Sequence, residues 1–376
     1  MRIIIDARKV NDYGIGTYIR RLGDACARLS PSDDFVFLGK VDPANGNRAL
    51  GDAARITGDN VTWEPNTSAK YGLRELISVS WQVRNLEGDV FHAPHYVYPF
   101  MLPCPGVVTI HDCIHLRFPQ QLPNPAASLY ARMMIRRAVA KSDRVLTVSE
   151  ATRADLVELV NADPSRIDVI PHGCDPYFLE TVDDLELSEV ARKHNLERPF
   201  LLSVTNIKPH KNLKRLLEAF GELHSDYDDL ELVIAGGRHN QHPELEAVCS
   251  SCGIQDRVRS VGFIPKQELR ALYNLARIFV FPSLYEGSGL PPLEAMACGT
   301  PVVASSSSAI PEIVGRSGLL VNPYCVDAIT EAVRSLLENS SFRDALGAQG
   351  KLRAHKFDWC ESARRVLDIY REVATL

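Results

Sequence analysis

The chain has 376 residues, of which 45% are hydrophobic and 24% are charged, and its formal net charge is −5 at pH 7. This length is enough for two domains of ordinary size, and the composition is ordinary for a globular protein. The negative charge argues against nucleic acid as a general partner. No apolar run approaches the roughly 18–20 residues that span a bilayer, and the N-terminal MRIIIDARKV predicts a first strand, not a signal peptide. We therefore expect a cytoplasmic protein.

The nine cysteines are scattered singly, apart from Cys249 and Cys252. An odd number without a paired framework is typical of reduced thiols. The lone C-x-x-C motif ends a helical pattern and has no second pair, whereas zinc needs about four ligands. The cysteines thus favour neither a metal site nor a redox role.

Apolar strand-like segments alternate with helical patterns through the first half of the chain. Strands are predicted at 2–7, 35–40, 61–65, 89–94, 106–112, 144–150 and 166–173. Helices are predicted at 15–30, 71–86, 125–142 and 150–160. This alternation indicates β-α-β units and a parallel sheet.

An acidic, turn-rich segment interrupts this pattern, and a second alternation follows it. Its strands are predicted at 199–204, 230–237, 258–263, 278–283, 301–305 and 318–323, and its helices at 212–225, 243–253, 265–276, from 291 or 292, and from 326 onward. We therefore predict an α/β protein with two doubly wound domains. The first covers residues 1–175, a hinge covers 176–198, the second domain covers 199–356, and a last helix lies within 357–376.

The most informative stretch is 278–304, IFVFPSLYEGSGLPPLEAMACGTPVVA. Proline is favoured in the first turn of a helix, which places the helix start near Pro291 or Pro292. Glu286 then lies on the loop after a strand, and Glu294 lies about one helical turn in. Ligands bind at this end of the strands in open parallel sheets.

The backbone N–H groups of Gly289 and Leu290 face outward at this helix start, where anions bind. A carboxylate on either side of an anion site suits a sugar–diphosphate–ribose ligand, because carboxylates accept hydrogen bonds from vicinal hydroxyls. Alternatively, both glutamates are solvated residues of a helix start, where acidic side chains are common. The flanking glycines, the two prolines and the two apolar strands favour the ligand site.

This stretch resembles the nucleotide-sugar signature of family-4 glycosyltransferases, which have the two-domain GT-B fold. The resemblance covers most of the chain and includes the motifs IDAR, GIGTY and TIHD in its first half. It implies that Glu286 contacts the donor sugar, that Glu294 contacts the ribose, and that the loop Gly287, Ser288, Gly289 and Leu290 lies against the donor. It also implies that the last helix crosses back onto the first domain.

Lys211 lies between the first strand and first helix of the second domain, where its ammonium can reach a diphosphate. Alone, a lysine at a helix start is usually solvated, but the resembled family uses a lysine here for the donor phosphates. That family often has arginine where this chain has Asn206, which leaves Lys208 and His210 as local candidates for a second cation. The resemblance also places Phe263 and Ile264 where the backbone meets the base.

In the first domain, His111 and Asp112 follow a strand, and the resemblance implies that His111 contacts the donor sugar near the reacting carbon. The alternative is a histidine that only closes a strand-end hydrogen bond. Gly14 and Gly16 let the backbone approach a ligand and open a helix; in the resembled family this loop faces the donor diphosphate and the acceptor. His172-Gly173 is predicted to support the hinge.

Two metal-binding patterns are rejected. The sequence HDCIH (111–115) needs a helix to bring its histidines together, but it follows a β pattern. Asp226 and Asp228 form a D-x-D in an acidic loop ahead of a strand. We therefore expect no metal and no separate cofactor, with the diphosphate neutralised by Lys211 and a helix dipole.

The helix from Tyr130 to Lys141 carries Arg132, Arg136 and Arg137 among Met and Ile residues. Spacing of three to four residues places several cations on one face, which either is solvated or meets anionic lipid headgroups. Peripheral contact with the inner face of a membrane thus remains open, as does the oligomeric state.

The resemblance implies retaining transfer of a hexose from a nucleotide sugar, most simply mannose from GDP-mannose, to a saccharide or lipid-linked acceptor. The first-half motifs resemble those of bacterial mannosyltransferases of polysaccharide and lipopolysaccharide assembly. Alternatives are a UDP-hexose donor, a UDP-sugar 2-epimerase, and a nucleotide-sugar-binding module without turnover. In the transferase, Glu286, Lys211 and His111 form the catalytic set.

Overall fold

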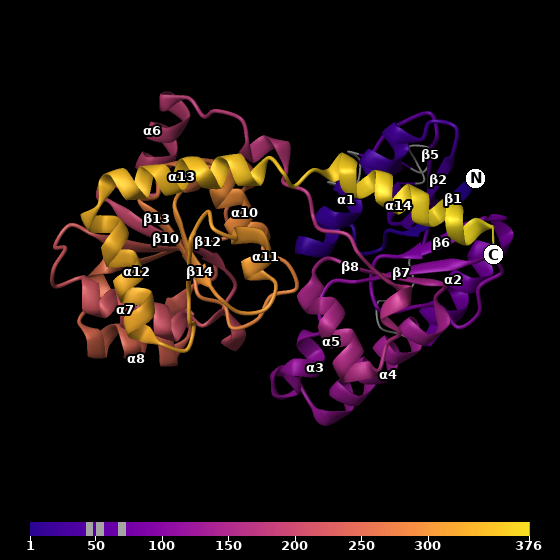
Figure 1. Ribbon diagram of the computed structural model, residues 1–376, viewed down its shortest axis with the longest axis horizontal. Coiled ribbons are helices and arrows are strands. Elements are labelled where there is room, and N and C mark those ends of the chain that lie inside the picture. Colours follow the sequence, from indigo (N-terminus) through magenta and orange to yellow (C-terminus); the bar gives the residue numbers. More distant parts are fainter. Residues whose placement is uncertain (43–47, 50–55, 67–72, 376) are drawn as a thin grey trace. The chain divides into compact units, whose positions relative to one another are not determined.

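The computed structural model describes residues 1–42, 48–49, 56–66 and 73–375. They form two compact units, one made of Met1–Gly173 and Asp358–Leu376 and the other of Cys174–Phe357 (Figure 1). The chain therefore leaves the first unit after Gly173 and returns to it at Asp358. Each unit is built on its own parallel sheet.

The sheet of the first unit has the strand order β5-β2-β1-β6-β7-β8-β9, and all of its pairs are parallel. Its strands are β1 (Arg2–Asp6), β2 (Asp34–Gly39), β5 (Val61–Pro65), β6 (Val90–Ala93), β7 (Gly106–Ile110), β8 (Arg144–Thr147) and β9 (Ile167–Val169), and β3 (Val41–Asp42) pairs with β4 (Arg48–Ala49) separately. Its helices are α1 (Tyr13–Leu29), α2 (Leu73–Asn85), α3 (Ile114–Arg117), α4 (Pro125–Lys141), α5 (Glu150–Val160) and α14 (Trp359–Ala374). The helix expected at 71–86 is α2, and residues 71–72 lie outside the described ranges, as does part of the polar segment between 40 and 60.

Helices cover both faces of this sheet, which explains why its strands are apolar without alternation. Ile3 and Ile5 face a core that includes α1 and α14, whereas Ile4 faces a core that includes α2, α4 and α5. Neighbouring residues of one strand thus enter opposite cores, as the period of a strand requires.

The last helix, α14, packs on α1 and lies in the first unit, as the resemblance implied. A buried polar chain ties it to the sheet. The hydroxyl of Tyr370 lies 2.5 Å from His92 Nδ1, His92 Nε2 lies 2.7 Å from Thr109 Oγ1, and Tyr18 Oη lies 2.9 Å from the same oxygen. Burial lowers the pKa of His92 to about 3, so its ring is neutral at physiological pH.

We expect Tyr370→Phe to lower the stability of the protein by about 1–3 kcal/mol, because it leaves a buried nitrogen of His92 without its partner. Thermal unfolding measures this as a melting temperature lower by several degrees. Tyr324→Phe is the matched control, since the Tyr324 side chain is 58% exposed. Equal melting temperatures for Tyr370→Phe and the parent would contradict a stabilising role for this chain of hydrogen bonds.

The sheet of the second unit has the order β12-β11-β10-β13-β14-β15 and is also parallel. Its strands are β10 (Phe200–Thr205), β11 (Glu231–Gly236), β12 (Val258–Gly262), β13 (Ile278–Phe281), β14 (Val302–Ser305) and β15 (Leu319–Val321). Its helices are α6 (Asp184–Lys193), α7 (Leu213–Leu223), α8 (Pro243–Cys252), α9 (Lys266–Leu275), α10 (Leu290–Ala297), α11 (Ile310–Val314), α12 (Val326–Glu338) and α13 (Ser340–Ala354). One core contains residues of α9, α10 and α11, and the core on the opposite face contains residues of α7, α8 and α12.

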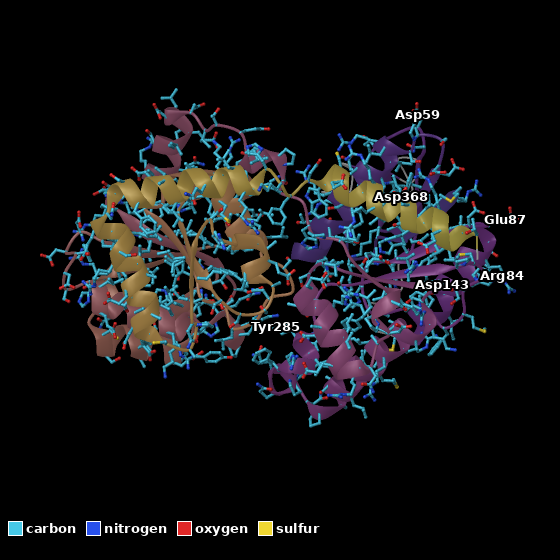
Figure 2. All side chains as sticks on the ribbon, viewed as in Figure 1. Asp59, Arg84, Glu87, Asp143, Tyr285 and Asp368 are labelled. Carbon is cyan, nitrogen blue, oxygen red and sulfur yellow. The ribbon has the colours of Figure 1, made fainter. Side chains whose placement is uncertain are left out.

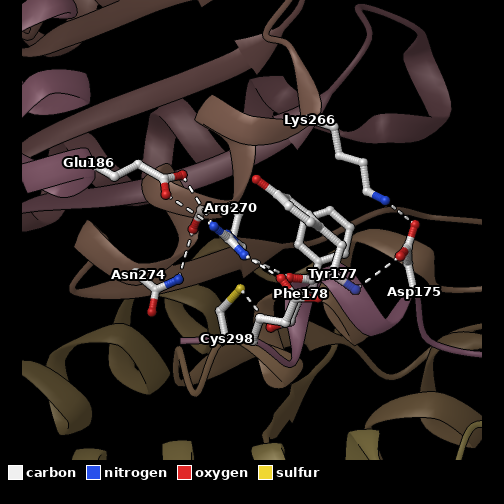
Figure 3. Close-up of polar contacts among 9 residues, drawn as sticks. Asp175, Tyr177, Phe178, Glu186, Lys266, Arg270, Asn274 and Cys298 are labelled. Atoms are coloured by element: carbon white, nitrogen blue, oxygen red, sulfur yellow. Dashed lines mark hydrogen bonds and ion pairs between the residues drawn. The ribbon is translucent and has the colours of Figure 1, made fainter. Parts of the chain in front are cut away.

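Residues 176–198 are part of the second unit and not a separate hinge, which corrects the prediction from their acidic composition. Figure 3 shows the reason: Arg270 of α9 donates to Glu186 Oε2 at 3.0 Å, and its guanidinium lies 4.0 Å from the centre of the Tyr177 ring. Lys266 pairs with Asp175 beside them. Glu180 and Glu186, two of the acidic side chains that suggested a solvated linker, are therefore partners of Arg270 on α9.

Candidate active site

In the second unit, the chain proceeds from the neighbouring strands β10 and β13 toward opposite edges of the sheet. From β10 the chain proceeds to β11 and β12 on one side, and from β13 it proceeds to β14 and β15 on the other. The carboxyl ends of β10 and β13 thus form a topological switch point, where ligands bind in open α/β sheets. The loops that follow these two strands carry Lys211 and Glu286.

Lys211 and Glu286 form an ion pair at this switch point. The ammonium Nζ of Lys211 donates to Glu286 Oε1 at 2.6 Å, and the two side chains are 15% and 16% exposed. Lys211 also lies 5.6 Å from the centre of the Phe281 ring. The structure therefore brings together two residues that are 75 positions apart and were predicted to contact the donor.

Asn212 joins the two loops that carry this pair. Its backbone has φ +60°, and its buried side-chain amide donates to the carbonyl oxygens of Pro282 at 3.0 Å and Pro323 at 2.6 Å. The N–H of Leu284 donates to the carbonyl of His210 at 2.7 Å. Sequence reasoning did not identify Asn212; its signal was an asparagine before a helix, a residue that tolerates positive φ.

The helix after Glu286 begins one residue before the predicted start, at Leu290 with Gly289 as the N-cap. The backbone N–H of Glu286 donates to Ser308 Oγ at 2.8 Å, which holds the loop against the segment after β14. A Cβ on Gly289 would lie only 3.2 Å from Ile313, so the glycine lets this helix start pack closely. Gly287 is buried and Ser288 is half-buried.

Glu294 lies on α10, half-buried beneath this loop. The Tyr273 hydroxyl of α9 donates to its Oε2 at 3.0 Å. Burial raises the pKa of Glu294 to about 7, opposed by the hydrogen bond from Tyr273 and by the charge of Lys266. The carboxyl is therefore poised to gain from hydrogen bonds that a ligand's hydroxyl groups would donate to it.

The raised pKa makes the stability of the free protein depend on pH. The unfolded chain loses this proton near pH 4.5, whereas the folded protein keeps it up to about pH 7. The contribution of Glu294 to stability is therefore lost as the pH rises from about 4.5 to 7. We expect Glu294→Gln to melt at a higher temperature than the parent at pH 8, by up to about 3 kcal/mol of stability, with little difference at pH 5. A difference that is equal at both pH values would contradict this assignment.

The other residues predicted for the donor lie at the same edge of the sheet. Asn206 and Lys208 are exposed after β10, and His210 is buried. Phe263, after β12, has a 72% exposed side chain, while Ile264 is buried.

His111 belongs to the first unit, at the carboxyl end of β7. Its Nε2 lies 3.1 Å from the carbonyl oxygen of Pro94, which only accepts, so Nε2 carries the proton and Nδ1 is an acceptor. Burial lowers its pKa to about 4, so the ring is neutral at pH 7. The strand-end hydrogen bond weighed as the alternative is present, and Nδ1 has no hydrogen-bond partner among the described residues. Asp112 accepts from the N–H of Ile114, the first residue of α3, at 2.9 Å.

Gly16 and Gly173 of the first unit allow close packing, whereas Gly14 does not. Gly16 is buried in α1, and a Cβ there would lie 2.4 Å from the carbonyl oxygen of Val10, whereas a Cβ on Gly14 would meet nothing within 4 Å. A Cβ on Gly173 would lie 2.3 Å from the backbone nitrogen of Trp359, where the chain re-enters the unit. The ring centres of His172 and Trp359 lie 5.4 Å apart, with the ring planes tilted by 31°.

The rejected metal patterns have other contacts. His111 precedes α3 and His115 lies on it, so the two do not share a helix face. Asp226 pairs with Arg334 at 2.5 Å. Within the described ranges, no group of three or more His, Cys, Asp or Glu residues could hold a metal ion, and no helix is long and apolar enough to cross a membrane.

Comparison with known proteins identifies the family. The domain Glycosyltransferase Family 4 matches residues 13–178, and the domain Glycosyl transferases group 1 matches residues 186–353. The chain is 30% identical over 294 residues to the O-antigen chain mannosyltransferase B of Escherichia coli, covering 78% of this chain and 76% of that protein. This protein is a family-4 glycosyltransferase.

Two further similarities place the glycosyltransferase among its relatives. It is 29% identical over 235 residues to the serotype-specific mannosyltransferase WbdA of Escherichia coli, covering 61% of this chain but only 28% of that longer protein. The structure of HepE from Anabaena in complex with UDP-glucose is similar in fold, with a TM-score of 0.77 at 17% identity over 99% of this chain and 100% of HepE. The predicted GT-B fold, with two Rossmann-like α/β domains, is thus confirmed.

Proposed function

We propose that this glycosyltransferase transfers mannose from GDP-mannose to a saccharide or lipid-linked saccharide, with retention of the anomeric configuration and without a metal ion. The observation that carries the proposal is the Lys211–Glu286 pair at the switch point, 2.6 Å apart and largely shielded from water. The mannosyl donor is supported by the two mannosyltransferase relatives at about 30% identity.

The proposed chemistry needs stabilisation of the charge that develops on the leaving diphosphate. Lys211 supplies a positive charge beside that diphosphate, and the outward N–H groups at the start of α10 supply partial positive charge. Glu286 accepts hydrogen bonds from the hydroxyl groups of the sugar, and His111 orients the sugar through Nδ1. Attack from the face of the leaving group, with the donor phosphate accepting the proton of the acceptor hydroxyl, retains the configuration without a protein nucleophile.

A UDP-hexose donor is the second candidate. The observation that favours it is the fold shared with HepE, whose structure contains UDP-glucose. A UDP-sugar 2-epimerase or a protein that binds but never consumes a sugar nucleotide are the remaining alternatives. Release of free nucleoside diphosphate only when an acceptor is present separates a transferase from both.

A thermal-shift panel without metal tests the donor. GDP-mannose, UDP-glucose, UDP-GlcNAc, GDP, UDP and NAD are each added at about 100 times their expected Kd, where a ligand adds about 2.7 kcal/mol of stability. We expect GDP and GDP-mannose to stabilise the protein most, with no gain from added Mg²⁺. A shift with uridine nucleotides alone would select the second candidate, and no shift with any sugar nucleotide would refute both.

We also propose that α4 rests on an anionic membrane at the cytoplasmic face. The helix has no acidic residue and ends in Lys141, and its exposed face carries Leu129 and Met133, which are 68% and 55% exposed. The loop with Met101, which is 79% exposed, is held against α4 by Arg137, whose guanidinium donates to three carbonyl groups of residues 98–100. Apolar side chains next to cations in a chain of net negative charge suit an anionic lipid surface.

Vesicle binding measures this contact. We expect the protein to sediment with phosphatidylglycerol vesicles more than with phosphatidylcholine vesicles, and the variant Leu129→Glu/Met133→Glu to lose most of that binding. Leu185→Glu is the matched control, because Leu185 is 78% exposed on α6 of the other unit. Equal sedimentation of the parent and the double variant would show that α4 does not contact the membrane.

A further inference from the structure

Arg238 lies at the same edge of the second unit's sheet, on the side of β11 and β12. The turn before it is pressed against β10: the N–H of Gly237 donates to the carbonyl of Thr205 at 2.8 Å, and Gly236 has φ +101°. A Cβ on Gly236 would lie 2.7 Å from that carbonyl oxygen. The turn therefore has one geometry, which needs glycine and fixes where Arg238 begins.

The Arg238 side chain runs over Gly262, at the end of β12. Its Nε lies 3.2 Å, and its Nη2 3.5 Å, from the position that a Cβ on Gly262 would occupy. A register shift in the β11–β12 pair sets Gly262 opposite Ala235, which brings the end of β12 level with this turn. Gly262 is followed in the chain by the exposed Phe263. Arg238 is followed by His239, which is anchored because its Nδ1 lies 2.6 Å from Ser260 Oγ.

The guanidinium of Arg238 forms no ion pair with any residue in the described ranges, and the residue is exposed. Three other cations of the unit are paired: Lys266 with Asp175, Arg270 with Glu186, and Arg259 with Glu231 (the first two pairs in Figure 3). An unpaired guanidinium on a fixed backbone, beside an exposed aromatic ring, is suited to a ligand that offers acceptors and a flat surface.

In the proposed function, the nucleoside of the donor lies near Arg238 and Gly262. Its diphosphate lies at Lys211 and its ribose at Glu294, whose carboxyl interacts electrostatically with Lys266 at the start of α9. The loop between Gly262 and Lys266 therefore lies at the nucleoside end. We propose that Arg238 recognises the base of the donor and selects guanine, with its guanidinium on the O6/N7 edge and the ring of Phe263 against the face of the base.

The chemistry of the two bases explains the selection. Guanine presents two adjacent acceptors, O6 and N7, that match two N–H groups of one guanidinium. Uracil has only O4 on the corresponding edge, next to a carbon-bound hydrogen, and offers no bidentate contact. The inference rests on the proposed function, which it deepens by naming a residue that separates GDP from UDP donors.

The test measures dissociation constants of GDP, UDP and 7-deaza-GDP by titration calorimetry. Arg238→Met keeps a long side chain over Gly262 but has no N–H groups. We expect the GDP constant to rise roughly tenfold or more in this variant, with UDP unchanged. In the parent, 7-deaza-GDP, which lacks N7, binds more weakly than GDP, and in Arg238→Met the two bind equally. Arg192→Met, an exposed arginine on α6, is the control and should bind like the parent.

Other outcomes overturn the inference. Equal losses for GDP and UDP would make Arg238 a phosphate ligand, and no loss for either would place it outside the site. A parent that prefers UDP would refute guanine selection while leaving the glycosyltransferase with its alternative donor. A parent that binds no nucleoside diphosphate would refute the proposed function itself.

Discussion

Glu286→Gln should lower sugar transfer by about 10²- to 10³-fold while GDP binds as well as, or more tightly than, to the parent. Glu286 accepts from Lys211 at 2.6 Å, so removal of its charge frees the ammonium for the diphosphate. The same change removes the charged acceptor proposed for the hydroxyl groups of the sugar. Opposite effects on turnover and on GDP affinity therefore distinguish a role at the sugar from simple loss of fold.

The measurement is the release of GDP from GDP-mannose in the presence of an acceptor, with calorimetry for GDP alone. Glu286→Ala, which also removes the polar amide, should abolish transfer while the fold stays intact. Glu244→Gln is the control, because Glu244 is exposed on α8 of the same unit. Turnover of either Glu286 variant close to that of the parent would contradict the role proposed for Glu286.

Lys211→Met should weaken GDP binding by about a hundredfold and transfer by at least as much. The substitution removes the cation beside the diphosphate and leaves the Glu286 carboxylate without its partner at the place that an anion must approach. The double variant Lys211→Met/Glu286→Gln should therefore regain part of the lost GDP affinity, since the two residues are in contact and their effects are not additive.

Calorimetry with GDP and UDP checks this expectation. Lys214→Met is the matched control, because Lys214 is 68% exposed on α7, three residues after Lys211. If GDP and UDP bind Lys211→Met as tightly as the parent, Lys211 is not a phosphate ligand. If the double variant binds GDP no more tightly than Lys211→Met does, the Glu286 carboxylate does not repel the diphosphate.

Much of the fold was predictable because its signals are local. Strands buried on both faces, such as β10 and β13, are continuous apolar runs, and the helices between them have their own periodicity. The loop and helix start from Glu286 to Glu294 were predicted within one residue, because glycine and proline favour particular backbone conformations at a loop and at a helix start.

The composition of one segment was misleading. Residues 176–198 were predicted as a hinge because they are acidic and turn-rich, but Arg270, which lies much later in the chain, pairs with Glu180 and Glu186 of this segment. Composition reports how polar a segment is and not which charges surround it, so the sequence could not distinguish a packed acidic segment from a solvated one.

The sequence by itself determined the class of fold and the family and proposed the residues of the candidate donor site, since these depend on local backbone requirements and short spacings. Only the tertiary structure decided which groups lie together: Lys211 with Glu286, Tyr273 with Glu294, and the Arg238 side chain beside the backbone of Gly262. Lys211 and Glu286, for example, follow β10 and β13, which are neighbours in the sheet but not in the chain. Contacts of that kind depend on packing over the whole unit, which no short segment encodes.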